Sequence, residues 1–467
     1  MSRILRRRLL LAGFGLVLTA GAALGAYTAL SRREVTTSSA EALRYYRLGR
    51  ENERAMYSKE ALAAYAEALK YDPHFVMATV RLAALTRERD PERARALYDG
   101  VRPFLGSISE RERLSVRLFE MGLAQKEPKE MEPVLDEWIR RFPDDPEPYF
   151  LRANFYVKTD RMPQAIADLE KLISLNPNFA TAYNTLGYYF LGQGDYAKAE
   201  EYLRRYRFLV PDQANPYDSL GELYVSIGRY QEAEEFLKKA LEVKPDFYPS
   251  LAHLGTLEVA RGDLPAASEK FRKAAELTDE PGMRGEWTFC AAISLAIAGK
   301  TEEALALIEK GPPLKAEGDE KLQKSWERQN HLNRSLILSV VGLSREAQAE
   351  LDALAALCTE LPAEARARWE REAGISRGFI AAHEGRHEAA VAAFREAIPK
   401  GPMAGGFGYF PARDYLHVAL ASSLAQLGRV DEAEAALKPV LSRNPKFQAA
   451  VDVLARLKSG TPAAPRS

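Results

Sequence analysis

Apolar residues along the chain recur with the 3.6-residue period of amphipathic helices, and residues 215–244 show the pattern clearly. Tyr217, Leu220 and Tyr224 follow one another at i, i+3 and i+7, the spacing of one face of a helix. Gly228 comes next, and glycine readily adopts the left-handed backbone conformation that ends many helices. The pattern therefore predicts a helix followed by a tight turn.

The second half of the same stretch predicts a partner helix. Ala233, Leu237 and Ala240 recur at i, i+4 and i+7. Pro245 ends the pattern because proline lacks an N–H and clashes with the preceding helical turn. The small side chains of Gly221 and Ala233 allow the two helices to approach closely, and Leu237 fills the space beside them. Each unit is thus predicted to be a helical hairpin whose apolar face a neighbouring unit must bury.

The hairpin pattern recurs every 34 residues. Four kinds of residue keep this interval in the middle of the chain: Pro143, Pro177, Pro211 and Pro245; Gly187, Gly221 and Gly255; Ala165, Ala199, Ala233 and Ala267; and Tyr149, Tyr183 and Tyr217. Self-similarity at a fixed period of this length is the signature of a stacked repeat protein. The chain is therefore predicted to form an array of helical hairpins.

The order aromatic, Leu-Gly, Tyr, Ala, large apolar residue, Ala and Pro resembles the tetratricopeptide repeat (TPR). The resemblance is strong over residues 146–279. One further good unit lies nearer the amino terminus and is carried by Tyr45, Leu48, Gly49, Ala61, Tyr65, Ala68 and Pro73. Residues 76–107 and 112–145 keep fewer of these positions, so degenerate repeats are expected there.

Beyond residue 280 the register slips and then returns. Residues 285–361 predict two helical pairs, around Ala304 and Ala347. The repeat positions reappear at Gly378, Ala390, Phe394, Ala397 and Pro402 and again at Leu420, Ala421, Leu424, Ala433, Leu437 and Pro445. About ten or eleven units are expected. No strand-like alternation of useful length occurs, so the predicted fold class is all-α, and the resemblance implies a TPR-type α-solenoid, a right-handed superhelix of helical hairpins.

The net charge of zero conceals two different segments. The chain of 467 residues has 65 Lys and Arg against 65 Asp and Glu, but the first 33 residues hold six Arg and no acid. The remaining 434 residues therefore carry 59 basic against 65 acidic groups. A mildly acidic array argues against nucleic-acid binding, and two Cys are too few for a disulfide scaffold.

Residues 9–30 form an uncharged run that is long enough, at about 1.5 Å per residue, to span the ~30 Å core of a bilayer. Four Arg precede this run and two follow it closely, so the positive-inside rule keeps the amino terminus in the cytoplasm. The alternative is a cleaved secretory signal, because Ala20-Gly21-Ala22 has the small-x-small form of a processing site. Either interpretation sends the array out of the cytoplasm, and cleavage of residues 1–22 stays open.

Five parts are therefore predicted. They are a basic amino terminus with a transmembrane or signal helix (1–33), a regular TPR array (34–281), degenerate helical repeats (282–362), carboxy-terminal TPR-like repeats (363–458) and a disordered tail (459–467). The expected location is the inner membrane of a bacterium, single-pass, with the array in the periplasm. The bacterial setting comes from the resemblance. The alternative is a periplasmic or secreted protein.

His383-Glu384-Gly385-Arg386-His387 matches the H-E-x-x-H pattern, in which two His on one continuous helix bind zinc. Alignment of the repeats places Gly385 at the turn held by Gly228 and places His387 at the start of the next helix. The match is therefore predicted to be accidental. No catalytic residue, metal site or cofactor is expected.

Two further features keep open alternatives. Cys290 and Cys358 lie 68 residues apart. They form a disulfide only if their Cα atoms come within about 7 Å, and buried free thiols are the favoured state. The glycine-rich stretch 401–411 carries three aromatic residues and is interpreted as an extended connection between repeats or as a docking loop.

The resemblance implies that the first helix of each unit lines a concave binding groove. The residues that this alignment points to are Phe150, Asn154, Asn184, Tyr188, Asp218, Glu222 and His253. One TPR subclass clamps a partner's terminal carboxylate with basic and Asn side chains. Asp218 and Glu222 stand where positive charge would be needed, so no such clamp is expected.

The predicted function is a non-enzymatic scaffold or adaptor that binds protein or peptide partners along this groove. It would be displayed on the outer face of the inner membrane by the amino-terminal helix. The alternative is a glycan- or solute-binding sensor, or a component of secretion or envelope assembly, that uses the same groove; Phe150 and Tyr188 are its aromatic candidates.

Overall fold

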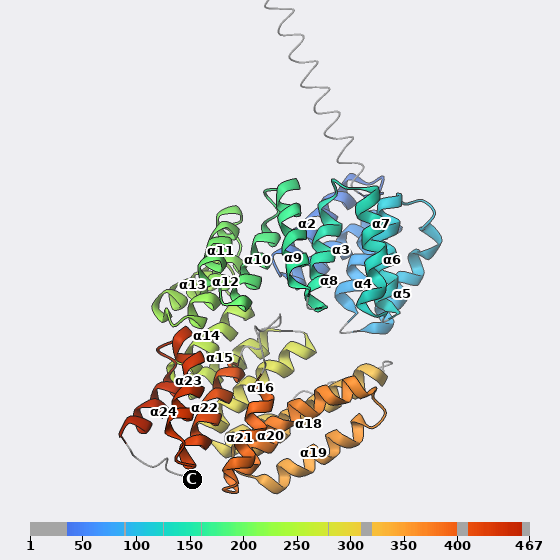
Figure 1. Cartoon of the computed structure of the whole chain (residues 1–467). Coiled ribbons are helices and arrows are strands. Elements are labelled where there is room, and N and C mark those ends of the chain that lie inside the picture. The colour runs from blue at the N-terminus through green and yellow to red at the C-terminus, as the bar shows by residue number, and fades with distance from the viewer. Residues whose placement is uncertain are drawn as a thin grey trace, which may run out of the picture. The chain divides into compact units, whose positions relative to one another are not determined.

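A computed structural model describes residues 35–87, 90–124, 126–159, 161–278, 280–309, 320–398 and 410–459. These residues form 23 α-helices and one short 3₁₀ turn, and no strand occurs among them (Figure 1). The all-α prediction is confirmed for this part of the chain. The predicted membrane or signal helix, most of the glycine-rich stretch 401–411 and the tail lie outside the described residues. None of the described helices is long and apolar enough to cross a membrane.

The chain divides into two compact units between Asp144 and Asp145. The described helices of the first unit are α2 (Ala40–Arg54), α3 (Ser58–Tyr71), α4 (Val76–Thr86), α5 (Pro91–Val101), α6 (Glu110–Leu123) and α7 (Pro128–Arg141), with a 3₁₀ turn at Arg102–Phe104. Tyr46, Tyr65 and Phe75 are buried at the centre of this unit. Its three helical pairs are the good repeat and the two degenerate repeats that the sequence predicts.

The second unit continues the same construction. Its helices are α8 (Pro146–Lys158), α9 (Met162–Leu175), α10 (Ala180–Gln193), α11 (Tyr196–Leu209), α12 (Asn215–Ser226), α13 (Tyr230–Val243), α14 (Tyr248–Arg261), α15 (Leu264–Leu277), α16 (Pro281–Ile297), α17 (Thr301–Glu309), α18 (Glu320–Val340), α19 (Ser344–Cys358), α20 (Ala363–His383), α21 (His387–Ala397), α22 (Ala412–Gln426), α23 (Val430–Arg443) and α24 (Gln448–Ser459). The two helical pairs predicted around Ala304 and Ala347 are present as α16–α17 and α18–α19, and both alanines are fully buried.

Close contact between the two helices of a hairpin depends on the small residue of the first helix. A Cβ atom placed on Gly221 would lie 2.5 Å from Cγ of Leu237, and one placed on Gly187 would lie 2.5 Å from Cδ2 of Leu203. Leu203 and Leu237 are fully buried. The large side chain of the second helix thus occupies the space that glycine leaves empty on the first, as the sequence pattern predicts.

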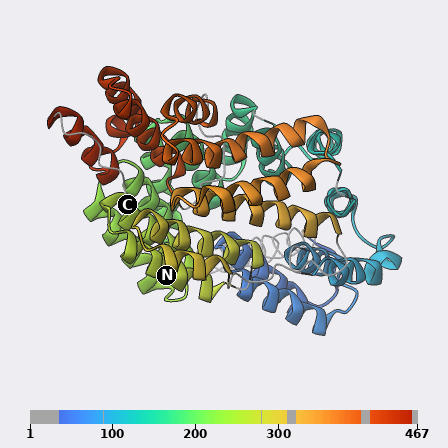
Figure 2. The same cartoon turned by 90° about the horizontal axis from the view of Figure 1, so that it is seen from below.

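The last hairpin of the second unit lies against helices about 200 residues earlier in the chain. Figures 1 and 2 both show the red helices α22–α24 beside the green helices around α13 and α14. The side chain of Asn444, after α23, reaches Val225 at the end of α12 and Tyr230 at the start of α13.

The H-E-x-x-H match is divided between two helices, as predicted. Helix α20 ends at His383, Gly385 takes the left-handed conformation with φ 73°, and α21 begins at His387. The prediction of free thiols is also confirmed, because Cys290 and Cys358 are both unbonded and buried.

The contact between Gly221 and Leu237 makes a direct prediction about stability. Gly221→Ala should lower the free energy of unfolding of the second unit by about 1–3 kcal/mol, because the added methyl group overpacks the hairpin. Urea unfolding of the full chain in detergent, followed by circular dichroism, measures the change.

Gly374→Ala is the matched control, because Gly374 is also helical but nothing lies within 4 Å of the point that its Cβ atom would occupy. There alanine should raise the stability by about 0.5–1 kcal/mol through its higher helix propensity. Equal effects of the two substitutions would contradict the proposed packing role of Gly221.

Candidate functional site

The repeat period aligns polar residues on the first helices of three successive hairpins, α10, α12 and α14. Asn184 and Asp218 are 34 residues apart, as are Tyr188 and Glu222, so each pair occupies one repeat position in neighbouring units. Ser219 and His253 form a third such pair. Stacking therefore brings polar groups of consecutive repeats side by side.

Hydrogen bonds connect α10 to α12. The Tyr188 hydroxyl donates to Oε2 of Glu222 over 2.8 Å and lies 3.3 Å from the Ser219 hydroxyl. Ser219 in turn donates to Oδ1 of Asn184 over 2.9 Å. Asn184 and Tyr188 are half-buried, whereas Ser219 is fully buried.

A second set of contacts connects α12 to α14. Nδ1 of His253 lies 2.9 Å from Oδ1 of Asp218, and Nε2 of His253 lies 3.3 Å from Oε2 of Glu222. The Ser250 hydroxyl donates to the same Oδ1 of Asp218 over 2.7 Å. Asp218, Glu222 and His253 are only 2%, 8% and 7% exposed, so the imidazole bridges two carboxyl groups in a site with little access to water.

Burial and charge act in opposite directions on the imidazole. Burial disfavours the charged ring, but the carboxylates of Asp218 and Glu222 outweigh it and raise the pKa of His253 to about 9. Burial also raises the pKa of the Glu222 carboxyl, although the neighbouring His253 opposes this shift. The pKa of Tyr188 is raised by burial and by the same carboxyl groups, so its hydroxyl stays protonated and can donate. At neutral pH the ring of His253 is therefore a cation held between two acids.

Five of the seven residues proposed from the sequence lie in this one network: Asn184, Tyr188, Asp218, Glu222 and His253. Phe150 on α8 packs instead against Phe179, with the ring centroids 5.6 Å apart. Asn154 lies half-buried one helical turn further along α8.

Sequence reasoning did not identify Ser219 and Ser250, which are both fully buried members of the network. A serine on the buried face of a helix resembles the small core residues of the repeat. The signal that was available is the 34-residue spacing between Ser219 and His253.

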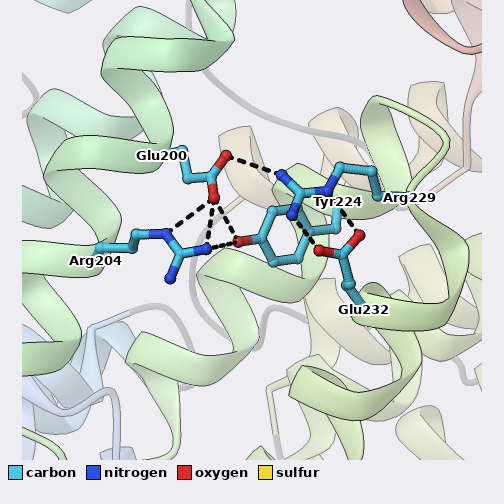
Figure 3. A network of polar contacts seen from close by, with 5 residues as sticks. All are labelled: Glu200, Arg204, Tyr224, Arg229 and Glu232. Carbon is cyan, nitrogen blue, oxygen red and sulfur yellow. Dashed lines mark hydrogen bonds and ion pairs between the residues drawn. The ribbon is translucent and has the colours of Figure 1, made fainter.

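A separate polar network lies on the second helices of the same repeats (Figure 3). Glu200 on α11 accepts hydrogen bonds from Arg204 at 2.7 Å, from the Tyr224 hydroxyl at 2.8 Å and from Arg229 at 3.0 Å. Arg229 also pairs with Glu232 and stacks over the Tyr224 ring, 4.2 Å from its centroid. Burial opposes ionisation of Glu200, but the hydrogen bonds from Arg204 and Tyr224 and the charge of Arg229 lower its pKa overall. This network ties one hairpin to the next beside the candidate site.

The arrangement is suited to binding and to holding helices in register. The side chains of Asp218 and Glu222 are occupied by partners on α10 and α14, so the polar atoms nearest to solvent belong to Asn184 and Tyr188. No cluster of three or more metal-ligating side chains with suitable geometry occurs among the described residues.

Family models identify the repeat. Three models of the tetratricopeptide repeat match the chain, at residues 150–218, 214–247 and 381–457. The chain therefore contains tetratricopeptide repeats in two stretches of its second unit, and the first two matches include α10 and α12 of the candidate site.

No curated protein matches the chain. Solved structures with similar helical arrays include MamA 41-end from Desulfovibrio magneticus RS-1, with 26% identity, TM-score 0.31 and coverage of 36% of this chain and 96% of that one. PilF of Pseudomonas aeruginosa has 19% identity, TM-score 0.33 and coverage of 46% and 91%. The Cut9–Hcn1 hetero-tetramer of APC/C has 15% identity, TM-score 0.46 and coverage of 89% and 76%. With every one of these TM-scores below 0.5, the likenesses support no statement about function.

The bridging imidazole predicts how stability depends on pH. The pKa of His253 is about 9 in the folded chain against about 6.5 in an unfolded one. Its contribution to stability is therefore complete below pH 6.5 and is lost as the pH rises through 9. His253→Gln should lower the free energy of unfolding by about 3 kcal/mol near pH 6.5, and the gap to the unsubstituted chain should close towards pH 10. Urea unfolding at several pH values measures this gap.

His331→Gln is the control, because His331 also contacts a carboxylate, that of Glu350 at 2.6 Å, but is about one-third exposed. Solvent screening should keep its effect below about 1 kcal/mol at every pH. A gap for His253→Gln that does not change with pH would show that the ring is not charged in the folded chain.

Proposed function

We propose that this chain is a non-enzymatic scaffold that binds protein or peptide partners across the first helices of its repeats. The cross-repeat network on α10, α12 and α14 carries the proposal. Its buried hydrogen bonds hold polar groups of three consecutive repeats in one arrangement, and such preorganisation lowers the entropic cost of binding.

Asn184 and Tyr188 are the members that a partner would contact, because both are half-buried while Asp218, Glu222 and His253 lie beneath them with their polar atoms in use. Phe150 and Asn154, also half-buried, would extend the contact surface along α8. Aromatic and amide side chains of this kind suit the backbone and side chains of a peptide.

The charge of the network favours partners without a free carboxylate at this position. Two carboxyl groups surround one imidazole, so a partner's terminal carboxylate would meet a net negative or neutral site. The mild excess of acidic residues in the array also disfavours nucleic acid.

We further propose that the array is displayed on the outer face of the inner membrane. This proposal rests on the uncharged run 9–30 and the Arg residues on its amino-terminal side. Sequencing of the mature amino terminus distinguishes an anchor from a cleaved signal: a chain that begins near residue 23 would contradict the anchor.

The binding surface has a direct test. Asn184→Ala combined with Tyr188→Ala should weaken partner capture at least tenfold, because it removes the accessible polar atoms of the surface. Crosslinking pull-down from membranes with the full chain measures capture. Asn178→Ala combined with Tyr217→Ala is the matched control. It removes the same residue types at an exposed turn position and at a tyrosine whose hydroxyl bonds to the Pro211 carbonyl.

Unchanged capture by the Asn184/Tyr188 variant, with circular dichroism showing intact helices, would overturn this surface. Screening the full chain against peptide libraries and glycan arrays separates the two classes of ligand. Binding to glycans alone would favour the sensor alternative over the scaffold.

A further inference from the structure

Repeats of a solenoid normally contact only their neighbours, but the last hairpin of the second unit also contacts much earlier repeats. The side chain of Asn444 is 3% exposed. Its Nδ2 donates to the carbonyl oxygen of Val225 over 3.2 Å, and its Oδ1 accepts from the Tyr230 hydroxyl over 3.0 Å. These bonds cross more than 210 residues of sequence.

The turn that receives Asn444 is shaped for it. Gly228 lies between the two partners with φ 77°, and a Cβ atom there would be 2.6 Å from Oδ1 of Asn444. The next turn makes a similar approach, because a Cβ atom on Gly262 would lie 2.9 Å from Cγ of Gln448. Two successive hairpin turns thus fit against the segment around α24.

A second contact lies at the other end of the last hairpin. Phe410, just before α22, is 8% exposed and packs into the hydrophobic cluster of α14, α15 and α16. Its backbone forms a hydrogen bond with the thiol of Cys290, which is 2% exposed in the same cluster. The hairpin is therefore held at two points, one polar and one apolar.

The long-range bonds of Asn444 are not needed to end its helix. Asn176 has the same place in an earlier repeat, after α9 and before a proline. Both Asn side chains accept a hydrogen bond over 3.2 Å from the backbone N–H two residues on. Only Asn444 combines this local bond with the bonds to Val225 and Tyr230, while Asn176 is half-buried at its turn.

We propose that Asn444 and Phe410 form a reversible clasp that closes the second unit. The last hairpin would leave α12–α16 as one body, and the array would exchange between a closed and an open state without unfolding its repeats. This proposal is independent of any partner.

The clasp acts on the helices that carry the candidate site. Helix α12 bears Asp218 and Glu222 and ends beside Val225, and α14 bears His253 and ends at Gly262. Closure therefore fixes the spacing of α12 and α14, and a ligand that prefers this spacing would favour the closed state.

The two cysteines provide the test. Cys290 lies beneath the clasp, whereas Cys358 is buried in a separate cluster formed by α18, α19 and α20. The full chain in detergent is treated with a thiol reagent, and the rate of modification of each cysteine is measured by peptide mass spectrometry. Asn444→Ala should raise the rate at Cys290 on the order of tenfold, because two hydrogen bonds that hold the closed state are lost, and should leave Cys358 unchanged.

Asn176→Ala is the matched control and should change neither rate, because it removes only the local bond. An unchanged rate at Cys290 in Asn444→Ala would overturn the clasp. An equal acceleration at both cysteines would also overturn it, because global unfolding rather than opening would then expose the thiols.

A second pair of variants approaches the contact from the other side. Gly228→Ala places a methyl group against Asn444, whereas Gly385→Ala imposes the same backbone strain at φ 73° with nothing within 4 Å. Only Gly228→Ala should accelerate modification of Cys290 relative to Cys358. Equal ratios in the two variants would contradict the clasp.

Discussion

The structure depends on the close approach of two helices at a residue without a side chain. Leu237 fits against Gly221, and Leu203 against Gly187, in the same way. Because the contact leaves no room for a methyl group, each hairpin has one geometry, and hairpins of one geometry stack with one offset. The 34-residue period of the sequence thereby becomes a regular spacing in space. Every alignment of side chains across repeats follows from this packing.

The candidate site is a consequence of that alignment. Residues one period apart meet on neighbouring first helices, so Tyr188 reaches Glu222 and His253 reaches Asp218. Burying two acids and one imidazole costs solvation, which the mutual contacts offset only if the helices stay in register. The network thus makes the position of α10, α12 and α14 more exact than apolar packing alone would. The network around Glu200 does the same on the second helices of these repeats.

Much of this was accessible from the sequence. The helical pairs around Ala304 and Ala347, the break at Gly385 and the free thiols of Cys290 and Cys358 all follow from local patterns. Five of the seven proposed site residues were grouped correctly because the repeat register assigns each residue a face. The register does not say how deeply a face is covered. Burial of Asp218 and His253 and the roles of Ser219 and Ser250 therefore became visible only in the structure.

The hairpins, their period and the polar positions of their first helices could all be predicted without coordinates, because they depend on contacts within one or two repeats. The meeting of Asn444 with Tyr230 and Val225, and the cover that Phe410 provides for Cys290, arise only when the whole second unit has folded. Such contacts depend on the small rotations between hairpins, which add up over the six repeats from α12 to α23. No local pattern records this sum, and Asn176, which has the same local sequence role as Asn444, ends its helix without it.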